Sequence, residues 1–145
     1  MIIPDVNLVI YAHIDGYAQH PVALRWWEQL LSGTDDIGII APVVMGFVRI
    51  VTNRRALTSP LSIEQAASTV DTWFEQPNVR FLPDTNATLR RSLDLLRELG
   101  VAGNLTTDAQ IAAHALEHSG TVATNDADFS RFAGVKTLNP LLGPA

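Results

Sequence analysis

The chain has 145 residues, of which 47% are apolar, so it is long enough for one domain with a real core and too short to suggest two. Ten Lys and Arg residues against fifteen Asp and Glu residues give a formal net charge of −5, which argues against binding nucleic acid by bulk electrostatics. Cysteine is absent and no apolar run approaches the roughly 20 residues of a membrane span, so a cytoplasmic protein without disulfides, thiolate metal sites or membrane contact is expected.

The first predicted strand ends on an acid. Residues 1–4 form a short apolar segment, and Pro4, which lacks an N–H, suits the end of a strand better than its middle. Asp5 follows directly, and Asn7 lies at the start of a short predicted helix. We interpret the segment as a central strand that delivers Asp5 to its carboxyl end.

The next two elements are a helix and a buried strand. A helix is predicted from His20 to about Leu31, with an apolar stripe of Val22, Trp26 and Leu30 at i, i+4 and i+8. Trp27 and Leu31 widen this stripe. Residues 37–41 form a continuous apolar run bounded by turn residues, which is typical of a strand buried on both faces.

A second predicted helix starts after Pro42 and carries cationic residues at its end. Its apolar face continues to Val51, with Arg49 near the end and Arg54 and Arg55 in the following loop. Arginine suits bidentate phosphate contacts, so these side chains are candidate RNA contacts. Ordinary solvated charges at the end of a helix are nearly as good an explanation.

Two further helices enclose a strand. Ser62 and Gln65 form a capping box that starts one helix, and residues 79–82 have the alternation and composition of a strand. The second helix ends at Gly100. Its predicted core positions are Leu89, Leu93, Leu96 and Leu99.

The last third of the chain repeats the alternation. The pattern predicts a helix from about Asp108, a strand over residues 120–124, a helical turn over residues 126–132 and a final strand over residues 135–138. Such alternation with short links favours an α/β fold: a three-layer sandwich whose central, mostly parallel sheet of four or five strands has helices on both faces.

Four acids are expected at one edge of this sheet. Asp5, Asp126 and Asp128 follow strands, and Asp108 opens a helix between strands, so all four can meet outside the carboxyl ends. Carboxylates so placed repel one another and raise one another's pKa unless a cation lies among them. Oxygen ligands favour a hard divalent ion, Mg²⁺ or Mn²⁺.

An aspartate-bound Mg²⁺ keeps several waters and typically works on phosphates, so hydrolysis of a phosphodiester by a metal-activated water is the expected chemistry. Candidate residues that orient the carboxylates or the water are Asn7, Thr107 and Asn125.

Each acid also has a simpler explanation. Asp108 suits the first turn of a helix, Asp126 suits a helix N-cap, and Asp5 suits a turn. It is the convergence of separate segments on one edge that favours a site. Phosphoacceptor receiver domains and haloacid-dehalogenase-type phosphatases also use acids at strand ends, but their pattern is disfavoured because Asn7 occupies the position two after Asp5.

Several motifs resemble the PIN domain, and more narrowly the VapC toxins of bacterial toxin–antitoxin pairs. They are residues 3–7, residues 47–49, residues 103–109 and residues 124–129. The resemblance covers about residues 1–142 as a single PIN domain, with residues 143–145 as a short C-terminal tail.

This resemblance implies an Mg²⁺- or Mn²⁺-dependent endoribonuclease, usually a homodimer, that cuts cellular tRNA, rRNA or mRNA and is held inactive by a cognate VapB-like antitoxin. By position, Asp5, Asp108 and Asp126 match the metal-binding acids, with Asp128 as a further catalytic acid. Arg49 matches an arginine often found on its helix.

One position departs from the pattern. PIN domains usually carry a glutamate three residues before that arginine, and Gly46 stands there in this chain. No acid occurs anywhere from Pro42 to Thr52. Fewer carboxylates favour one tightly bound ion, with a second arriving only with RNA. The alternative is a catalytically weakened PIN module that mainly binds RNA or a partner peptide.

Overall fold

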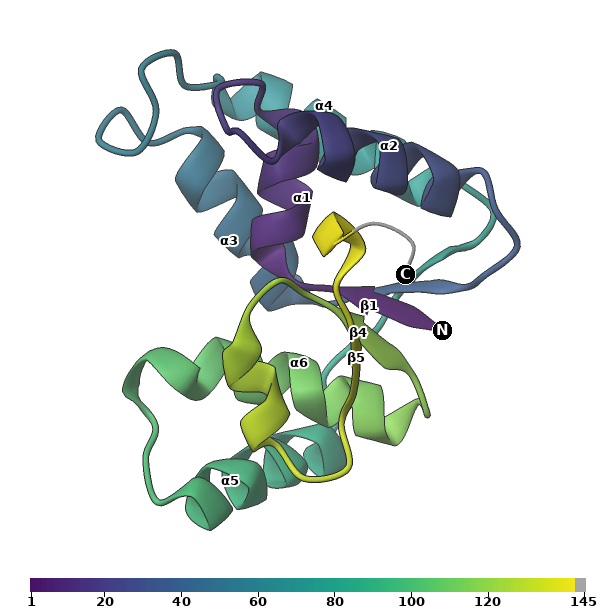
Figure 1. Ribbon diagram of the computed structural model, residues 1–145, viewed down its shortest axis with the longest axis vertical. Coiled ribbons are helices and arrows are strands. Elements are labelled where there is room, and N and C mark those ends of the chain that lie inside the picture. Colours follow the sequence, from purple (N-terminus) through teal and green to yellow (C-terminus); the bar gives the residue numbers. More distant parts are fainter. Residues whose placement is uncertain (143–145) are drawn as a thin grey trace.

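A computed structural model describes residues 1–142 and shows a five-stranded, fully parallel sheet (Figure 1). The strand order is β3-β2-β1-β4-β5. The strands are β1 (Ile2–Pro4), β2 (Ile37–Ile39), β3 (Val79–Phe81), β4 (Thr121–Ala123) and β5 (Lys136–Leu138). The predicted α/β fold with a parallel sheet and a central first strand is therefore confirmed, whereas the predicted tail at residues 143–145 lies outside the described residues.

Helices cover both faces of the sheet, which gives the expected three layers. Figure 1 shows α1 to α4 on one side and α5 and α6 on the other. The helices are α1 (Val6–His13), α2 (His20–Leu31), α3 (Ala41–Val51), α4 (Ile63–Phe74), α5 (Asn86–Leu99) and α6 (Thr106–Glu117), with short 3₁₀ turns at Gly103–Leu105, Ala127–Arg131 and Pro140–Leu142. Within residues 1–142, no helix has the length and apolar character needed to traverse a bilayer.

The register of the sheet sets two strand ends side by side. In the pairing of β1 with β4, Pro4 lies opposite Ala123. The Asp5 N–H then donates to the Ala123 carbonyl at 2.8 Å, and the Thr124 N–H donates to the Leu138 carbonyl at 2.9 Å. Residues that follow β1 and β4 therefore share one edge of the sheet, as the parallel arrangement predicts.

The apolar stripe predicted for α2 is correct at Trp27 and wrong at Val22. Val22 is 39% exposed, whereas Ala23 and Trp27 are fully buried. Trp27 packs edge-on against Trp73 at 5.7 Å between ring centroids, so this tryptophan belongs to the core.

The face predicted for α5 is correct at Leu96 and Leu99, which pack against the core, and wrong in the first half of the helix. Leu89 and Leu93 are 56% and 45% exposed, while Thr88, Ser92 and Leu95 are buried. Two hydroxyls can be buried here because each is satisfied inside the helix: Thr88 Oγ1 donates to the Thr85 carbonyl at 2.9 Å, and Ser92 Oγ donates to the Thr88 carbonyl at 2.9 Å. Their small size lets α5 lie close against α6, which is rich in buried alanine.

A partly buried histidine joins α1 to α4 in the helical layer above the sheet. His13 Nδ1 donates to the Val9 carbonyl at 2.7 Å, so Nε2 is left to accept from Trp73 Nε1 at 3.1 Å. Phe47 packs on the same imidazole at 5.3 Å. Burial lowers the pKa of His13 below its ordinary value of 6.5, because the charged form loses its hydration.

Acid is expected to destabilise the fold through His13. Because the folded-state pKa is lowered, this contribution is complete above the unfolded value of 6.5 and is lost as the pH falls toward the folded value. His13→Gln retains an amide oxygen that can accept from Trp73 but does not titrate. Urea unfolding between about pH 7.5 and about pH 5 should show a steeper loss of stability in the wild type than in His13→Gln. Parallel pH profiles would contradict this role.

Candidate active site

The acidic edge is built first around Asp5, which follows β1 and is only 3% exposed. Thr124, the residue after β4, donates from Oγ1 to Asp5 Oδ2 at 2.9 Å and accepts from the Asp126 N–H at 2.9 Å. Burial raises the pKa of Asp5, and the hydrogen bond from Thr124 opposes this only in part. One hydroxyl thus connects the end of β1 to the loop after β4.

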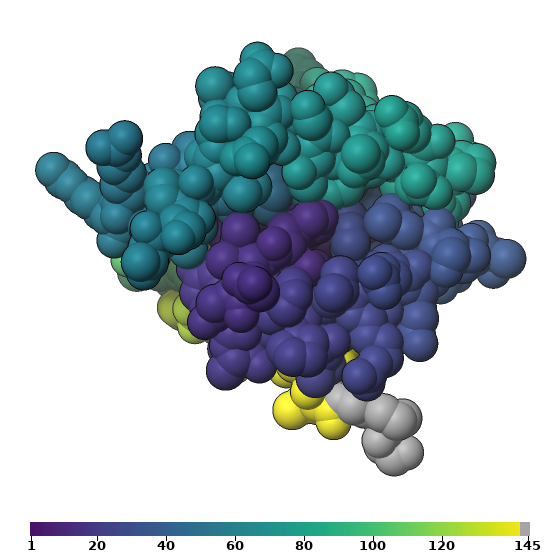
Figure 2. All heavy atoms as spheres, turned by 90° about the horizontal axis from the view of Figure 1, so that it is seen from above, coloured from purple at the N-terminus to yellow at the C-terminus, as the bar shows by residue number. Residues whose placement is uncertain are grey.

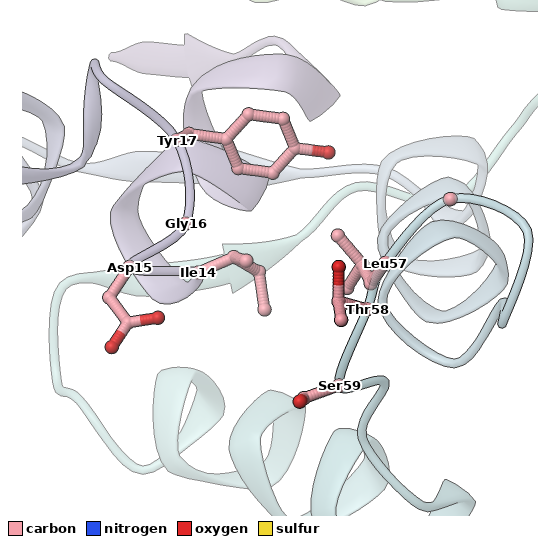
Figure 3. Close-up of a pocket in the computed structure, with 8 residues that line it drawn as sticks. Ile14, Asp15, Gly16, Tyr17, Leu57, Thr58 and Ser59 are labelled. Carbon is pink, nitrogen blue, oxygen red and sulfur yellow. The ribbon is translucent and has the colours of Figure 1, made fainter.

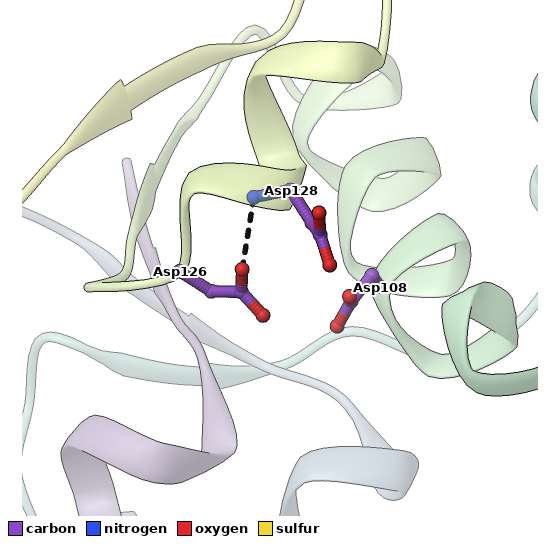
Figure 4. A group of neighbouring side chains, drawn as sticks. All are labelled: Asp108, Asp126 and Asp128. Carbon is purple, nitrogen blue, oxygen red and sulfur yellow. Dashed lines mark hydrogen bonds between the residues drawn. The ribbon is translucent and has the colours of Figure 1, made fainter.

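Asp126 and Asp128 come from the turn that follows β4. Asp126 is the N-cap of the Ala127–Arg131 turn, and its Oδ1 accepts from the Asp128 N–H at 2.8 Å (Figure 4). The capping interpretation of Asp126 is therefore confirmed. Capping occupies one side of the carboxylate, and Figure 4 shows the group still directed toward Asp108 and Asp128. Asp126 therefore both caps the turn and belongs to the acidic cluster.

Asp108 completes the cluster from the first turn of α6. One carboxylate oxygen each from Asp108, Asp126 and Asp128 lies within 4.8 Å of the other two. Loss of hydration, together with the smaller effect of the negative charges of Asp5, Asp126 and Asp128, raises the pKa of Asp108 to about 7. The side chain is thus held near its protonation midpoint at neutral pH.

This donor set fits a hard divalent cation. Oxygens bound to one Mg²⁺ at roughly 2.0–2.1 Å lie at most about 4.2 Å apart, so the cluster needs only a small contraction to share an ion. The raised pKa of Asp108 reflects its partial burial first and its acidic neighbours second, and a cation among the carboxylates would offset the repulsion between them. Asp5 lies outside the compact group, although its charge reaches Asp108.

The predicted supporting residues were placed less well than the acids. Within residues 1–142, the side chains of Asn7, Thr107 and Asn125 form no hydrogen bond with any of the acids. Thr124 performs this function and was missed. Its signal was weak, because a threonine at the end of an apolar run is also an ordinary β-strand residue.

The candidate RNA contacts lie at the surface. Arg49 is near the C-terminal end of α3, and Arg54 and Arg55 are in the exposed loop beyond it. None of the three forms an ion pair within the described part of the chain. Their role in RNA binding stays a prediction, and no ion pair joins them to the acids in this part of the chain.

Gly46 faces the first turn of α1. A Cβ added at this position would lie 3.1 Å from Val6 Cγ2, so the glycine lets α3 approach the residue that follows Asp5. A larger side chain there would require Val6 to move. Since α3 carries no acid at all, the carboxylates of the cluster come entirely from other elements.

A hollow of about 290 Å³ lies between the α1–α2 loop and the α3–α4 loop (Figure 3). Its lining consists of Ile14, Asp15, Gly16, Tyr17, Ala56, Leu57, Thr58 and Ser59. It shares no residue with the acidic cluster and offers no cationic side chain. The space-filling view from above shows the blue-teal α3–α4 loop projecting at the left edge, beside the purple N-terminal region (Figure 2). We assign the chemistry to the acidic edge.

Removing the Thr124 hydroxyl is expected to weaken this edge. Thr124→Val keeps the shape of the side chain but leaves Asp5 and the Asp126 N–H without their shared partner, which should destabilise the protein by about 1–3 kcal/mol. Metal affinity should fall by about 10- to 100-fold, as when groups that orient metal ligands are lost. Thr124→Ser, which retains the hydroxyl, is the control, and urea unfolding with Mn²⁺ calorimetry measures both quantities. Equal behaviour of the two variants would rule out the bridge.

Comparison with known families agrees with this geometry. The family model described as PIN domain matches residues 2–135. Ribonuclease VapC33 of Mycobacterium tuberculosis is 43% identical over 141 residues, covering 97% of this chain and 99% of the relative. Ribonuclease VapC37 of the same organism is 35% identical and covers 97% of each chain.

Solved structures show the same fold at lower identity. The M. tuberculosis toxin VapC20, which cleaves the sarcin–ricin loop, aligns with a TM-score of 0.70 at 19% identity, covering 94% of this chain and 99% of that one. The VapBC2 complex of Rickettsia felis, bound to a DNA fragment from its promoter, aligns with a TM-score of 0.69 at 20% identity, covering 96% and 98%. The fold, the family model and the full-length relatives agree, and the chain belongs to the PIN-domain family as one of its VapC ribonucleases.

Proposed function

We propose that this protein is the endoribonuclease toxin of a VapBC-type pair and hydrolyses RNA phosphodiester bonds with a divalent metal, Mg²⁺ or Mn²⁺. The observation that carries the proposal is the convergence of Asp108, Asp126 and Asp128 within 4.8 Å in a chain 43% identical to a VapC ribonuclease. The competing idea, a PIN module that only binds RNA or a peptide, is not favoured because the acidic cluster is intact despite Gly46.

The roles of the acids follow from their positions. Asp108, Asp126 and Asp128 hold the metal, and Asp5 acts through a water that its buried carboxylate orients. Thr124 fixes the Asp5 carboxylate through its hydrogen bond. A bound Mg²⁺ or Mn²⁺ supplies an activated water and stabilises the charge that develops on the scissile phosphate. Asp108, held near its protonation midpoint, gives up its proton when the site is loaded.

One tightly bound ion is expected in the absence of RNA. The three clustered carboxylates suffice for a single Mg²⁺ with several retained waters, and α3 adds no further acid. A second ion would need RNA phosphate oxygens as ligands. Mn²⁺ titration calorimetry with and without a non-cleavable RNA analogue measures this, and two sites in the free protein would contradict it.

The proposal extends to the molecules that this protein binds. Arg49, Arg54 and Arg55 contact RNA phosphate, and tRNA, rRNA or mRNA is the substrate. A VapB-like antitoxin is supported by the VapBC complexes among the structural neighbours, and the cytoplasm is the expected compartment.

A homodimer is supported by the exposed Leu89 and Leu93 on α5, which light scattering of wild type and Leu93→Asp would test.

The direct test is cleavage of total RNA by the purified protein. Mn²⁺ or Mg²⁺ should give discrete internal cuts, EDTA should abolish them, and added metal should restore them. Co-expression of a VapB-like antitoxin encoded next to the toxin gene should suppress both cleavage and growth arrest. If tRNA, rRNA and mRNA all stay intact with either metal at saturating concentration, the proposal is wrong.

A further inference from the structure

A polar pocket lies against the acidic site on the side of β5. Its volume is about 210 Å³, and its walls are the loop after β4 and the end of β5. The lining residues are Thr124, Asn125, Asp126, Ala127, Thr137, Leu138 and Asn139. Asp126 thus contributes both to this pocket and to the acidic cluster. A ligand that spans Asp126 would reach both.

The hydrogen-bonding groups of the pocket are neutral, apart from Asp126 on the shared wall. Asn139 Oδ1 accepts from the Leu141 N–H at 3.0 Å, which fixes the amide and leaves its NH₂ as a donor. The Asn125 amide and the Thr137 hydroxyl form no hydrogen bond within residues 1–142, so both retain donors and acceptors. A phosphate would find no cation here, whereas an uncharged heterocyclic edge would find several partners.

We propose that this pocket binds one unpaired nucleobase next to the scissile phosphate and so gives the enzyme a base preference at that position. The inference rests on the proposed ribonuclease function. Sequence-specific RNA recognition generally uses unstacked bases in single strands and hydrogen bonds to their edges. The pocket holds about seven waters' share of liquid volume, which is space for one base and not for a base pair.

The geometry of Asp126 explains why base and phosphate would be neighbours. Its carboxylate joins the metal-binding group, while the same residue borders the pocket that Asn125 and Asn139 line. An RNA strand crossing Asp126 therefore presents a phosphate to the acids and the adjoining base to the amides. Asn125, expected from the sequence to orient the acids, becomes a residue that determines specificity.

The test is cleavage of RNA hairpins with a randomised loop, with the cut ends sequenced. The wild type with Mn²⁺ should show a base preference at one position flanking the cut. Asn125→Ala removes one amide, and Asn139→Asp removes the NH₂ donor but keeps the acceptor for Leu141. Each should reduce the preference by roughly two- to tenfold, the effect of losing one or two hydrogen bonds. Mn²⁺ affinity should not change.

Asn86→Ala is the matched control, because Asn86 is an exposed asparagine at the start of α5 that belongs neither to the pocket nor to the acidic cluster. Its preference should equal that of the wild type. If the wild type cuts the loops without any base preference, or if both pocket variants keep the preference unchanged, the nucleobase pocket is wrong while the ribonuclease stands. If the wild type binds Mn²⁺ and cuts neither the hairpins nor cellular RNA, the proposed function fails first.

Discussion

Asp108→Asn is expected to lower kcat/KM for RNA cleavage by more than about 100-fold, because loss of groups that merely orient metal ligands already costs about 10- to 100-fold. Asparagine keeps the size of the side chain and removes the charge that a divalent cation needs. The partly buried location strengthens the effect, since water compensates less well for a missing ligand there.

A second measurement separates this effect from unfolding. Asp108 repels Asp5, Asp126 and Asp128 in the metal-free protein, so Asp108→Asn should raise the midpoint of thermal unfolding without metal while it abolishes cleavage. Asp71→Asn, on the exposed surface of α4, changes the net charge equally and should behave as the wild type in cleavage. An Asp108→Asn variant with wild-type cleavage would remove this residue from the site.

The sequence predicts the strands and the acidic edge well, for a physical reason. Short apolar runs such as residues 37–39 are buried on both faces of a parallel sheet, and their composition records that burial. In a parallel sheet, the residues that follow the strands all lie at the same edge. Asp5 and Asp126 could therefore be placed together from sequence, although 121 positions separate them.

The helix faces and Thr124 could not be placed in the same way. Leucines at positions 89 and 93 follow a helical period as well as Thr88, Ser92 and Leu95 do, and only the close approach of α6 selects the smaller residues. The Thr124 hydroxyl depends on the register of β1 against β4, which fixes its 2.9 Å hydrogen bond to Asp5. The periodicity of the sequence predicts neither the buried face of α5 nor the Thr124 hydrogen bond, because both depend on contacts between elements.

Metal binding is expected to strengthen steeply as the pH rises through about 7, which is the second large effect. The pKa of Asp108 is raised from 3.8 to about 7 in the metal-free fold, so at mildly acidic pH a cation must displace a proton from this carboxyl. The folded protein then holds a proton that the unfolded chain has lost. The contribution of Asp108 to stability without metal therefore falls as the pH rises from about 4 to about 7.

Bound Mn²⁺ should reverse that trend, because it neutralises the carboxylates that repel one another. Thermal unfolding with and without Mn²⁺ should show a much larger metal-induced shift at about pH 8 than at about pH 5.5, and calorimetry in buffers of different ionisation enthalpy should detect proton release below about pH 7. In Asp108→Asn the shift should be small at both values, since the titrating group is gone. A metal-induced shift that is the same at both pH values in the wild type would mean that Asp108 does not titrate with the metal, and the close approach of Asp108, Asp126 and Asp128 would then need another explanation.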